Sequence, residues 1–245
     1  MLWGPVGTST PKKALMGSDA NWERFTTLLK MAILACNDVC PDAKIILHTE
    51  RVQQPDVLEN FYNQMAKYNV PYEIIGLSYY PYFHGNLTVL DKALKTLTQK
   101  FSDKNIMIVE TGYSYKWEVP GTTVNNTSTW PYTEAGQAKF VRDLVAELDK
   151  YSQVDGLFWW WMEYNAFGTS LSGWYNAPLF DSTTGKATEA LKELCSFGTS
   201  AVEEIEADNS AATDSWYNLQ GIRVDKPKTS GIYIRNGRKT YVRVQ

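Results

Sequence analysis

Short apolar runs alternate along most of the chain with longer segments in which apolar residues recur every three or four positions. Runs of this kind are typical of strands buried in a parallel sheet, and the three-to-four spacing is typical of amphipathic helices. The runs predict strands at 44–48, 73–80, 106–110 and 154–161. The periodic segments predict helices at about 19–36, 55–69, 87–101, 134–151 and 186–197. We therefore expect a strand–helix unit that repeats four times.

The first predicted helix begins near Ser18 or Asp19, either of which can cap it. An apolar stripe at helical spacing faces a core, and here the stripe consists of Trp22, Phe25, Leu28, Leu29, Ala32, Ile33 and Cys36. Near the end of this helix, Cys36 and Cys40 lie four residues apart, and with Cys195 they form no metal-binding pattern. We interpret these two as small buried hydrophobic residues or as a fortuitous pair.

Alternating strands and helices predict a parallel sheet with right-handed crossovers. The strand ends would gather His48, Tyr80, Glu110 and Trp160 at one rim. In a (β/α) barrel this rim is the mouth where catalytic groups sit. Glu110 is the strongest candidate, because a glutamate that ends an apolar strand is costly to bury without a partner. The alternatives are that Glu110 merely ends its strand and that His48 is a core histidine with satisfied hydrogen bonds.

A long loop, at about 111–133, follows the strand that ends in Glu110. Loops of this length in compact domains are usually functional or disordered, and the aromatic residues in this one favour function. Two of its tryptophans, Trp117 and Trp130, either stack on a sugar or hold the loop in place.

Both ends of the chain differ from this repeating pattern. Residues 1–17 are rich in Gly and Pro and predict a loop, and residues 198–215 have the composition of a solvated linker. The last segment, 216–245, alternates apolar and polar residues, and Asn236-Gly237 predicts a hairpin within it. We expect a small β appendage there, which at about 30 residues is too short to be stable alone.

At 245 residues, with 44% hydrophobic and 21% charged residues, the chain suits one packed domain with a small appendage. Its net charge is −3 and it has no basic cluster, which argues against a nucleic-acid partner. No segment has the length of a membrane span, and the first residues lack the regions of a signal peptide.

Nine Trp and fifteen Tyr stand out, because sugars stack on aromatic rings. Within the last strand, Trp159 and Trp161 should point away from Trp160.

Three segments carry a family resemblance: 74–85 (IIGLSYYPYFHG), 108–115 (IVETGYSY) and 156–161 (GLFWWW). In this order and spacing they resemble endo-β-1,4-galactanases, glycoside hydrolase family 53. The resemblance implies a TIM (β/α)8-barrel fold, of which residues 1–197 would be the last four β/α units, the C-terminal half. It also implies a retaining endo-glycosidase that hydrolyses β-1,4-galactan, as in arabinogalactan and the side chains of pectin.

The resemblance implies a role for particular residues. Glu110 matches the catalytic nucleophile of the family, and His48, Tyr80 and Trp160 match positions that line the cleft. His84 is a weaker match, as a sugar contact. The remaining substrate-binding candidates lie in loops and are Trp117 and Glu163. The implied mechanism requires neither a metal nor an organic cofactor, and no Asp-rich loop demands Ca²⁺.

The departure from the family concerns the second carboxyl group. In the family, the acid/base glutamate lies in an Asn-Glu pair shortly before a Leu-Trp-Pro loop, which residues 1–7 (MLWGPVG) resemble. The acid/base residue is therefore expected upstream of Met1. Two carboxylates of this chain, Glu50 and Glu163, follow predicted strands but lie outside the family pattern, and Glu163 fits better as a residue that holds a loop or contacts sugar.

Several alternatives remain open at this stage. The chain could act on mannan or β-glucan instead, as a related hydrolase, or be a noncatalytic carbohydrate-binding remnant.

Half of a barrel would expose strand edges and apolar surface, which predicts self-association. Its last 30 or so residues resemble the short sorting-like β modules of secreted bacterial proteins, which predicts a secreted or cell-surface location. The alternative for that tail is a simple hairpin packed on the barrel.

Overall fold

A computed structural model of the chain describes residues 18–163, 173, 176–181, 183–198, 216–218, 223–227, 230–235 and 238–243. The chain divides into two compact units, residues 1–200 and residues 201–245. The predicted loop at 1–17, the predicted linker beyond residue 198 and the predicted turn at Asn236-Gly237 lie outside the described residues.

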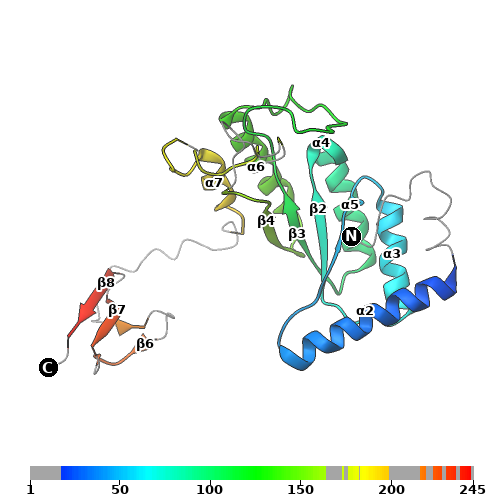
Figure 1. The fold of residues 1–245 in the computed structure, drawn as a ribbon, viewed down its shortest axis with the longest axis horizontal. Coiled ribbons are helices and arrows are strands. Elements are labelled where there is room, and N and C mark those ends of the chain that lie inside the picture. Colours follow the sequence, from blue (N-terminus) through cyan, green and yellow to red (C-terminus); the bar gives the residue numbers. More distant parts are fainter. Residues whose placement is uncertain are drawn as a thin grey trace. The chain divides into compact units, whose positions relative to one another are not determined.

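The larger unit is built on one parallel sheet. Its strands are β1 (Ile46–Thr49), β2 (Ile74–Tyr79), β3 (Asn105–Thr111) and β4 (Val154–Trp159). Their order in the sheet is β1-β2-β3-β4, and each strand pairs in parallel with the next one along the chain. Figure 1 shows β2, β3 and β4 side by side in this order. The sheet confirms the four predicted strands and their parallel pairing.

Helices precede, connect and follow these strands. They are α2 (Asp19–Val39), α3 (Pro55–Lys67), α4 (Pro81–His84), α5 (Leu87–Lys100), α6 (Glu134–Leu148) and α7 (Glu189–Leu194). Sequence periodicity does not predict the short helix α4, which Pro81 begins because its fixed φ suits a first helical turn. Ser18 caps α2 as predicted, by accepting the Asn21 N–H. Among the described helices, none combines the length and apolar character that a membrane span requires.

One face of the sheet carries the core. Helices α3, α5 and α6 cover this face (Figure 1). The Tyr62 hydroxyl of α3 donates a hydrogen bond of 2.9 Å to the Leu47 carbonyl of β1. The Phe140 ring of α6 packs on Trp159 of β4, with ring centroids 6.3 Å apart. Because successive side chains of a strand point to opposite faces of the sheet, the strand residues at the intervening positions lie on the other face.

The opposite face carries Gly76 between two apolar side chains, together with polar residues nearer the C-terminal ends of the strands. A methyl group on Gly76 would lie 2.7 Å from Ile46 Cγ2 and 3.1 Å from Val109 Cγ2. Since such close contacts are not tolerated in a packed interior, glycine is required where these two side chains meet. The same face carries His48 on β1 and Ser78 on β2, toward the C-terminal ends of the strands.

Strand β3 contains one extra residue near its C-terminal end. Leu77 pairs with Ile108, but the next residue, Ser78, pairs with Glu110, so that Val109 is passed over. The pairing of β3 with β4 shifts over the same residues. A β-bulge of this kind re-aims the side chains that follow it. Without it, Glu110 would point to the face that the helices cover.

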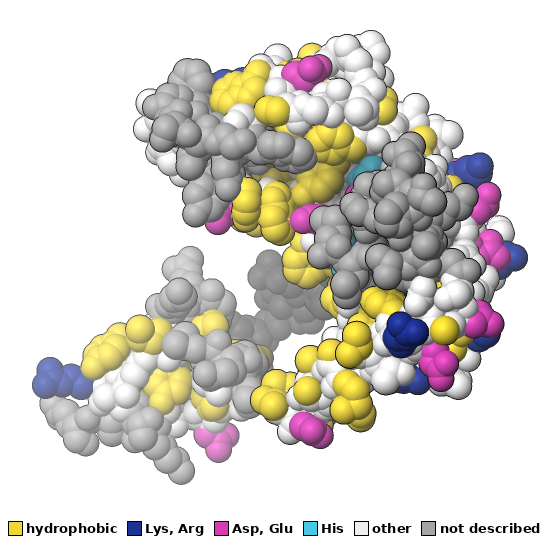
Figure 2. Space-filling model, turned by 45° about the vertical axis from the view of Figure 1, so that its right-hand side comes forward, with side chains coloured by type: hydrophobic (Ala, Val, Ile, Leu, Met, Phe, Trp, Pro, Cys, Tyr) yellow, Lys and Arg dark blue, Asp and Glu magenta, His cyan; other side chains and the backbone are white. Residues whose placement is uncertain are grey.

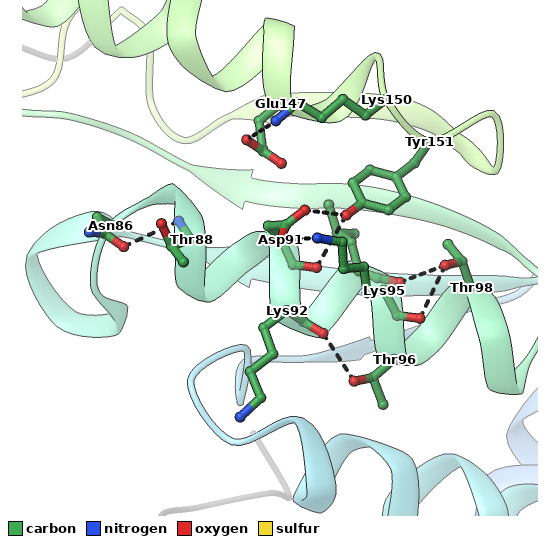
Figure 3. Close-up of polar contacts among 11 residues, drawn as sticks. Asn86, Thr88, Asp91, Lys92, Lys95, Thr96, Thr98, Glu147, Lys150 and Tyr151 are labelled. Atoms are coloured by element: carbon green, nitrogen blue, oxygen red, sulfur yellow. Dashed lines mark hydrogen bonds and ion pairs between the residues drawn. The ribbon is translucent and has the colours of Figure 1, made fainter.

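A polar cluster joins α5 to the end of α6 (Figure 3). The Tyr151 hydroxyl donates to Asp91, and Asp91 also pairs with Lys95 at 2.7 Å. Glu147 pairs with Lys150 at 2.7 Å. These contacts fix the angle between two helices that support β2 and β3.

Helix α2 is buried on one side only. Its buried residues are Trp22, Thr26 and Ile33. The predicted stripe is wrong for Leu28, Ala32 and Cys36, which are exposed. Cys36 and Cys40 are exposed free thiols, so their interpretation as buried hydrophobic residues is also wrong. Periodicity shows which side chains share a face of a helix, but not whether another element covers that face.

The smaller unit is an antiparallel sheet. Its strands are β5 (Trp216–Tyr217), β6 (Arg223–Val224), β7 (Gly231–Arg235) and β8 (Arg238–Val242), in the order β6-β5-β7-β8. Arg235 pairs with Arg238, which confirms the predicted hairpin between β7 and β8. The Arg235 guanidinium lies 4.9 Å from the centre of the buried Trp216 ring, a cation–π contact.

Candidate active site

The C-terminal ends of β1, β2 and β3 bring three polar side chains together. His48 Nε2 lies 2.6 Å from Ser78 Oγ, and Ser78 Oγ donates a hydrogen bond of 2.6 Å to Glu110 Oε2. A serine hydroxyl has one proton, which goes to the carboxylate, so His48 must donate its Nε2–H to Ser78. Glu110 is half-buried and Ser78 is buried. The bulge in β3 makes this hydrogen-bonded chain possible, because it turns Glu110 toward Ser78.

The surroundings of His48 favour its neutral form. Burial lowers the pKa of its imidazole, although the nearby charges of Glu110 and Glu50 act in the opposite direction. A neutral imidazole with its proton on Nε2 keeps Nδ1 as an acceptor. The chain of hydrogen bonds therefore holds Glu110 Oε2 and leaves its other oxygen, Oε1, for a different partner.

Tyr80 lies directly after β2, near Glu110. Burial, and secondarily the charge of Glu110, raise the pKa of the Tyr80 hydroxyl, so it stays protonated and can donate a hydrogen bond. Its ring stacks on Tyr82, with centroids 5.7 Å apart and planes 23° apart. The structure therefore brings Tyr80 to the same rim as Glu110, as the strand-end pattern predicts.

His84 supports Tyr80 through the backbone. Its Nδ1 accepts the Tyr80 N–H at 2.9 Å, and its ring stacks on Tyr79 with centroids 6.3 Å apart. Only 7% of His84 is exposed. Burial and the Arg51 charge lower the pKa of His84 to about 4. Its direct contact with sugar stays a prediction, whereas its role in positioning Tyr80 follows from these contacts.

The titration of His84 predicts acid sensitivity. Its pKa is about 4 in the folded chain and about 6.5 for an unperturbed histidine, so the unfolded chain takes up the proton first. The stability that neutral His84 contributes is thus complete above pH 6.5 and is lost as the pH falls toward 4, by about 3 kcal/mol. Melting curves from pH 7 to 4 should show this loss, and His84→Asn, whose amide oxygen can accept the Tyr80 N–H, should reduce it. An identical acid profile in both chains would contradict the assignment.

An ion pair that no sequence pattern predicts follows β1, where Arg51 pairs with Glu50. Arg51 Nη2 is 3.1 Å from Glu50 Oε1, and Arg51 is 9% exposed. The Arg51 Nε is buried without a hydrogen-bond partner among the described residues. Both residues follow β1 without any motif, so no sequence signal distinguishes them from an ordinary loop. Ser78 was missed for a similar reason, because one serine in an apolar strand is common in cores.

The three tryptophans at the end of β4 and just beyond it separate into two groups. Trp159 is buried, and its indole N–H donates to the Ala177 carbonyl at 2.7 Å. Trp160 and Trp161 are 41% and 38% exposed, and their rings stack with centroids 4.8 Å apart. The expectation that Trp161 points away from Trp160 is wrong, because the strand ends at Trp159 and Trp161 has φ 53°. The Trp160 N–H donates to the Thr111 carbonyl at 2.7 Å, which brings this aromatic pair beside the Glu110 strand.

The long loop after β3 is fixed by its own aromatic residues. Trp130 is buried against Phe140 and donates to Asp143 at 2.7 Å, so of its two predicted roles the structure supports holding the loop. Trp117 is partly exposed, and its N–H donates to the Gly173 carbonyl at 3.2 Å. Glu163 is exposed and lies beyond the end of β4. The described residues contain no group of three His, Cys, Asp or Glu that could hold a metal ion.

Comparison with known proteins connects this geometry to a family. Residues 3–194 match the family model of Glycosyl hydrolase family 53. An uncharacterised protein in the bgaB 5′ region of Niallia circulans is 33% identical over 152 residues, 59% of this chain and 40% of that protein. An arabinogalactan endo-β-1,4-galactanase of Cellvibrio japonicus is 29% identical over 203 residues, 73% of this chain and 52% of that protein.

Solved structures agree with the family match. The GH53 catalytic domain of Ignisphaera aggregans superposes with a TM-score of 0.62 at 32% identity, covering 72% of this chain and 53% of that one. The sheet of four parallel strands is thus part of a TIM-type barrel. The chain spans about half the length, or less, of the relatives it matches. It belongs to Glycosyl hydrolase family 53.

Proposed function

We propose that this chain supplies the nucleophile half of a retaining endo-β-1,4-galactanase active site, with Glu110 as the nucleophile. The observation that carries the proposal is the hydrogen-bonded chain from His48 through Ser78 to Glu110 at the C-terminal rim of the sheet. This rim is where barrel enzymes keep their catalytic residues. The galactanase relative from Cellvibrio japonicus supports galactan as the substrate class.

The reaction would proceed by double displacement. Glu110 Oε1 attacks the anomeric carbon while Ser78 holds Oε2, and the bond from that carbon to the leaving oxygen breaks. An acid protonates the leaving oxygen, and the same group, now a base, takes a proton from the water that releases the sugar from Glu110. The Tyr80 hydroxyl, which stays protonated, is suited to donate a hydrogen bond near the reacting carbon.

The acid/base group is proposed to come from the part of the barrel that the relatives have beyond the matched region. A retaining pair of carboxyl groups lies about 5–5.5 Å apart. Among the described carboxylates near the rim, Glu50 is paired with Arg51, and Glu163 is exposed beyond β4. Neither joins the hydrogen-bonded chain of Glu110, so Glu163 is assigned to sugar contact instead.

Sugar binding is proposed for the exposed aromatic pair Trp160 and Trp161. The C–H groups of galactose form an apolar face that fits an indole surface, and the two rings already stack on each other. His48 and Trp117 are the further binding candidates at this rim. Export to the cell surface or the medium remains part of the proposal, because a polymeric substrate lies outside the cell.

Replacing Trp161 with alanine should weaken binding of a galactotetraose by about five- to tenfold, since an aromatic contact contributes about 1 kcal/mol beyond its buried area. Isothermal titration calorimetry can measure this. Tyr241→Ala, which removes an exposed aromatic ring of the smaller unit, should leave the affinity unchanged. Equal affinities in all three chains would remove the aromatic pair from the binding site.

A substrate with an activated leaving group tests the nucleophile without the missing acid. Dinitrophenolate needs no proton to depart, so the chain mixed with 2,4-dinitrophenyl β-galactobioside should release a burst of one dinitrophenolate per chain. The 2-deoxy-2-fluoro analogue should leave a covalent sugar on a peptide that contains Glu110, as mass spectrometry can show. A chain that binds galactan in a pull-down but gives neither burst nor adduct would instead be a carbohydrate-binding remnant. Faster bursts with mannobioside or glucobioside analogues would favour mannan or β-glucan.

A further inference from the structure

We propose that Asn176 is a positioning residue that holds Trp117 in place as a sugar contact. Asn176 lies in the segment between β4 and α7 and is fully buried. Trp117 lies in the long loop after β3 and is partly exposed. The inference rests on the proposed function, in which Trp117 binds sugar, and its test separates the failure of one from the failure of the other.

The Asn176 side chain uses both halves of its amide on the loop after β3. Its Nδ2 donates a hydrogen bond of 2.6 Å to the Trp117 carbonyl, and its Oδ1 accepts the Lys116 N–H at 3.3 Å. The backbone carbonyl of Asn176 accepts the Tyr115 N–H at 2.8 Å. One residue is thus bonded to three successive residues of the loop. An alanine here would remove the two side-chain bonds, and an aspartate could not donate to the carbonyl.

A second contact fixes the indole of Trp117. Its N–H donates to the Gly173 carbonyl at 3.2 Å. A methyl group on Gly173 would lie 3.3 Å from Pro120 Cγ and 3.5 Å from Trp117 Nε1, so this segment runs close against the loop. Trp117 is therefore held at its backbone by Asn176 and at its ring by Gly173. A ring that is already fixed loses less rotamer freedom when a ligand binds, and this raises the affinity.

The residue next to Asn176 borders the candidate active site. A methyl group on Gly112, two residues after Glu110, would lie 3.5 Å from Ala177 Cβ and 3.5 Å from Tyr80 Cε1. In Figure 2 a histidine, coloured cyan, lies beside hydrophobic side chains in a hollow of the larger unit. Both histidines of the chain contact residues of this rim, so the hollow marks it. Asn176 therefore joins Trp117 to the segment that borders Tyr80.

A double-mutant cycle on the full chain tests this assignment. Asn176→Ala and Trp117→Ala should each weaken binding of a galactotetraose by about five- to tenfold in isothermal titration calorimetry. The double variant should bind no more weakly than Trp117→Ala alone, because Asn176 acts through Trp117. At saturating 2,4-dinitrophenyl β-galactobioside the burst should keep its rate to within about twofold in all three variants, because affinity and not the attack of Glu110 is changed.

Gln137→Ala is the matched control for a loss of stability. The Gln137 side chain is also a fully buried amide that joins the same two segments. It donates to the Tyr113 carbonyl at 2.9 Å and to the Pro178 carbonyl at 3.2 Å, so both bonds go to residues other than Trp117. Gln137→Ala should lower the melting temperature about as much as Asn176→Ala does, and should change the affinity by no more than about twofold.

Three results would overturn the role of Asn176. If the two single losses multiply in the double variant, Asn176 acts independently of Trp117. If Asn176→Ala and Gln137→Ala weaken binding equally, Asn176 only supports the structure of the two segments. If Trp117→Ala binds like the native chain, Trp117 is not a sugar contact, whereas the tests of Trp161 and Glu110 still decide the rest of the proposed function.

A native chain without affinity for galactotetraose would contradict the proposed function itself, and the role of Asn176 would fall with it. Should Asn176→Ala fail to melt cooperatively, Asn176→Ser takes its place in the cycle. Serine keeps a small polar group at this position, so a smaller loss of affinity is expected, again absent in the Trp117→Ala background.

Discussion

Glu110→Ala is expected to abolish the burst of dinitrophenolate from the activated galactobioside, by about a thousandfold or more in rate. The reason is that Glu110 Oε1 is the proposed attacking atom, and no other described carboxylate joins the chain of His48 and Ser78. Stopped-flow absorbance can measure the burst. Because alanine leaves a space where the carboxylate was, added azide should enter it and restore release, giving a galactobiosyl azide with the inverted α configuration.

Two other carboxylates provide matched controls for this experiment. Glu50→Ala and Glu163→Ala remove a carboxylate from the same rim but not from the hydrogen-bonded chain, so both should keep the burst at saturating substrate, and Glu163→Ala should need more substrate to reach it because Glu163 is the proposed sugar contact. Ser78→Ala should keep it at a rate about ten- to a hundredfold lower, because a hydrogen bond to a charged group contributes about 1.5–3 kcal/mol. A full burst from Glu110→Ala, or its loss from Glu163→Ala, would mean that the nucleophile has been assigned to the wrong residue.

Exchanging Val109 and Glu110, as V109E combined with E110V, should remove the burst as completely as Glu110→Ala does. The exchange keeps the number of residues in β3 and therefore keeps the bulge. It moves the carboxylate to the position whose side chain packs against Ile46 over Gly76, away from Ser78. The moved carboxylate should also lower the melting temperature, since position 109 is half-buried beside the apolar side chain of Ile46 and a charge loses part of its hydration there.

Val109→Ala is the matched control for the exchange. It keeps Glu110 at its own position and should retain the burst, with a loss of stability of about 1–2 kcal/mol from the removed methyl groups. If the exchanged chain folds cooperatively and still gives a full burst, the bulge does not determine where the nucleophile points.

Much of the fold follows from local sequence patterns. The apolar runs predict all four strands of the larger unit, because strands buried on both faces have no other reason to be continuously apolar. The Asn236-Gly237 pair predicts the hairpin that the pairing of Arg235 with Arg238 confirms. The sequence also predicts that Glu110 lies at the rim, because Glu110 ends an apolar run and a parallel sheet gathers its strand ends at one rim.

The remaining features depend on contacts that no local pattern records. A bulge adds a residue to a strand without changing its composition, so the alignment of Ser78 with Glu110 could not be predicted. The burial of His84 depends on the short helix α4, which turns its ring under the Tyr80 backbone. The exposure of Leu28 depends on what lies beside α2, and the stacking of Trp160 on Trp161 depends on one positive φ.

The order of the strands in the larger sheet has a consequence for how the sheet forms. Each strand pairs with its successor in the chain, so the sheet grows by adding one unit at a time, without long-range searches. We therefore expect the rim that carries His48, Ser78 and Glu110 to form as soon as these strands have left the ribosome.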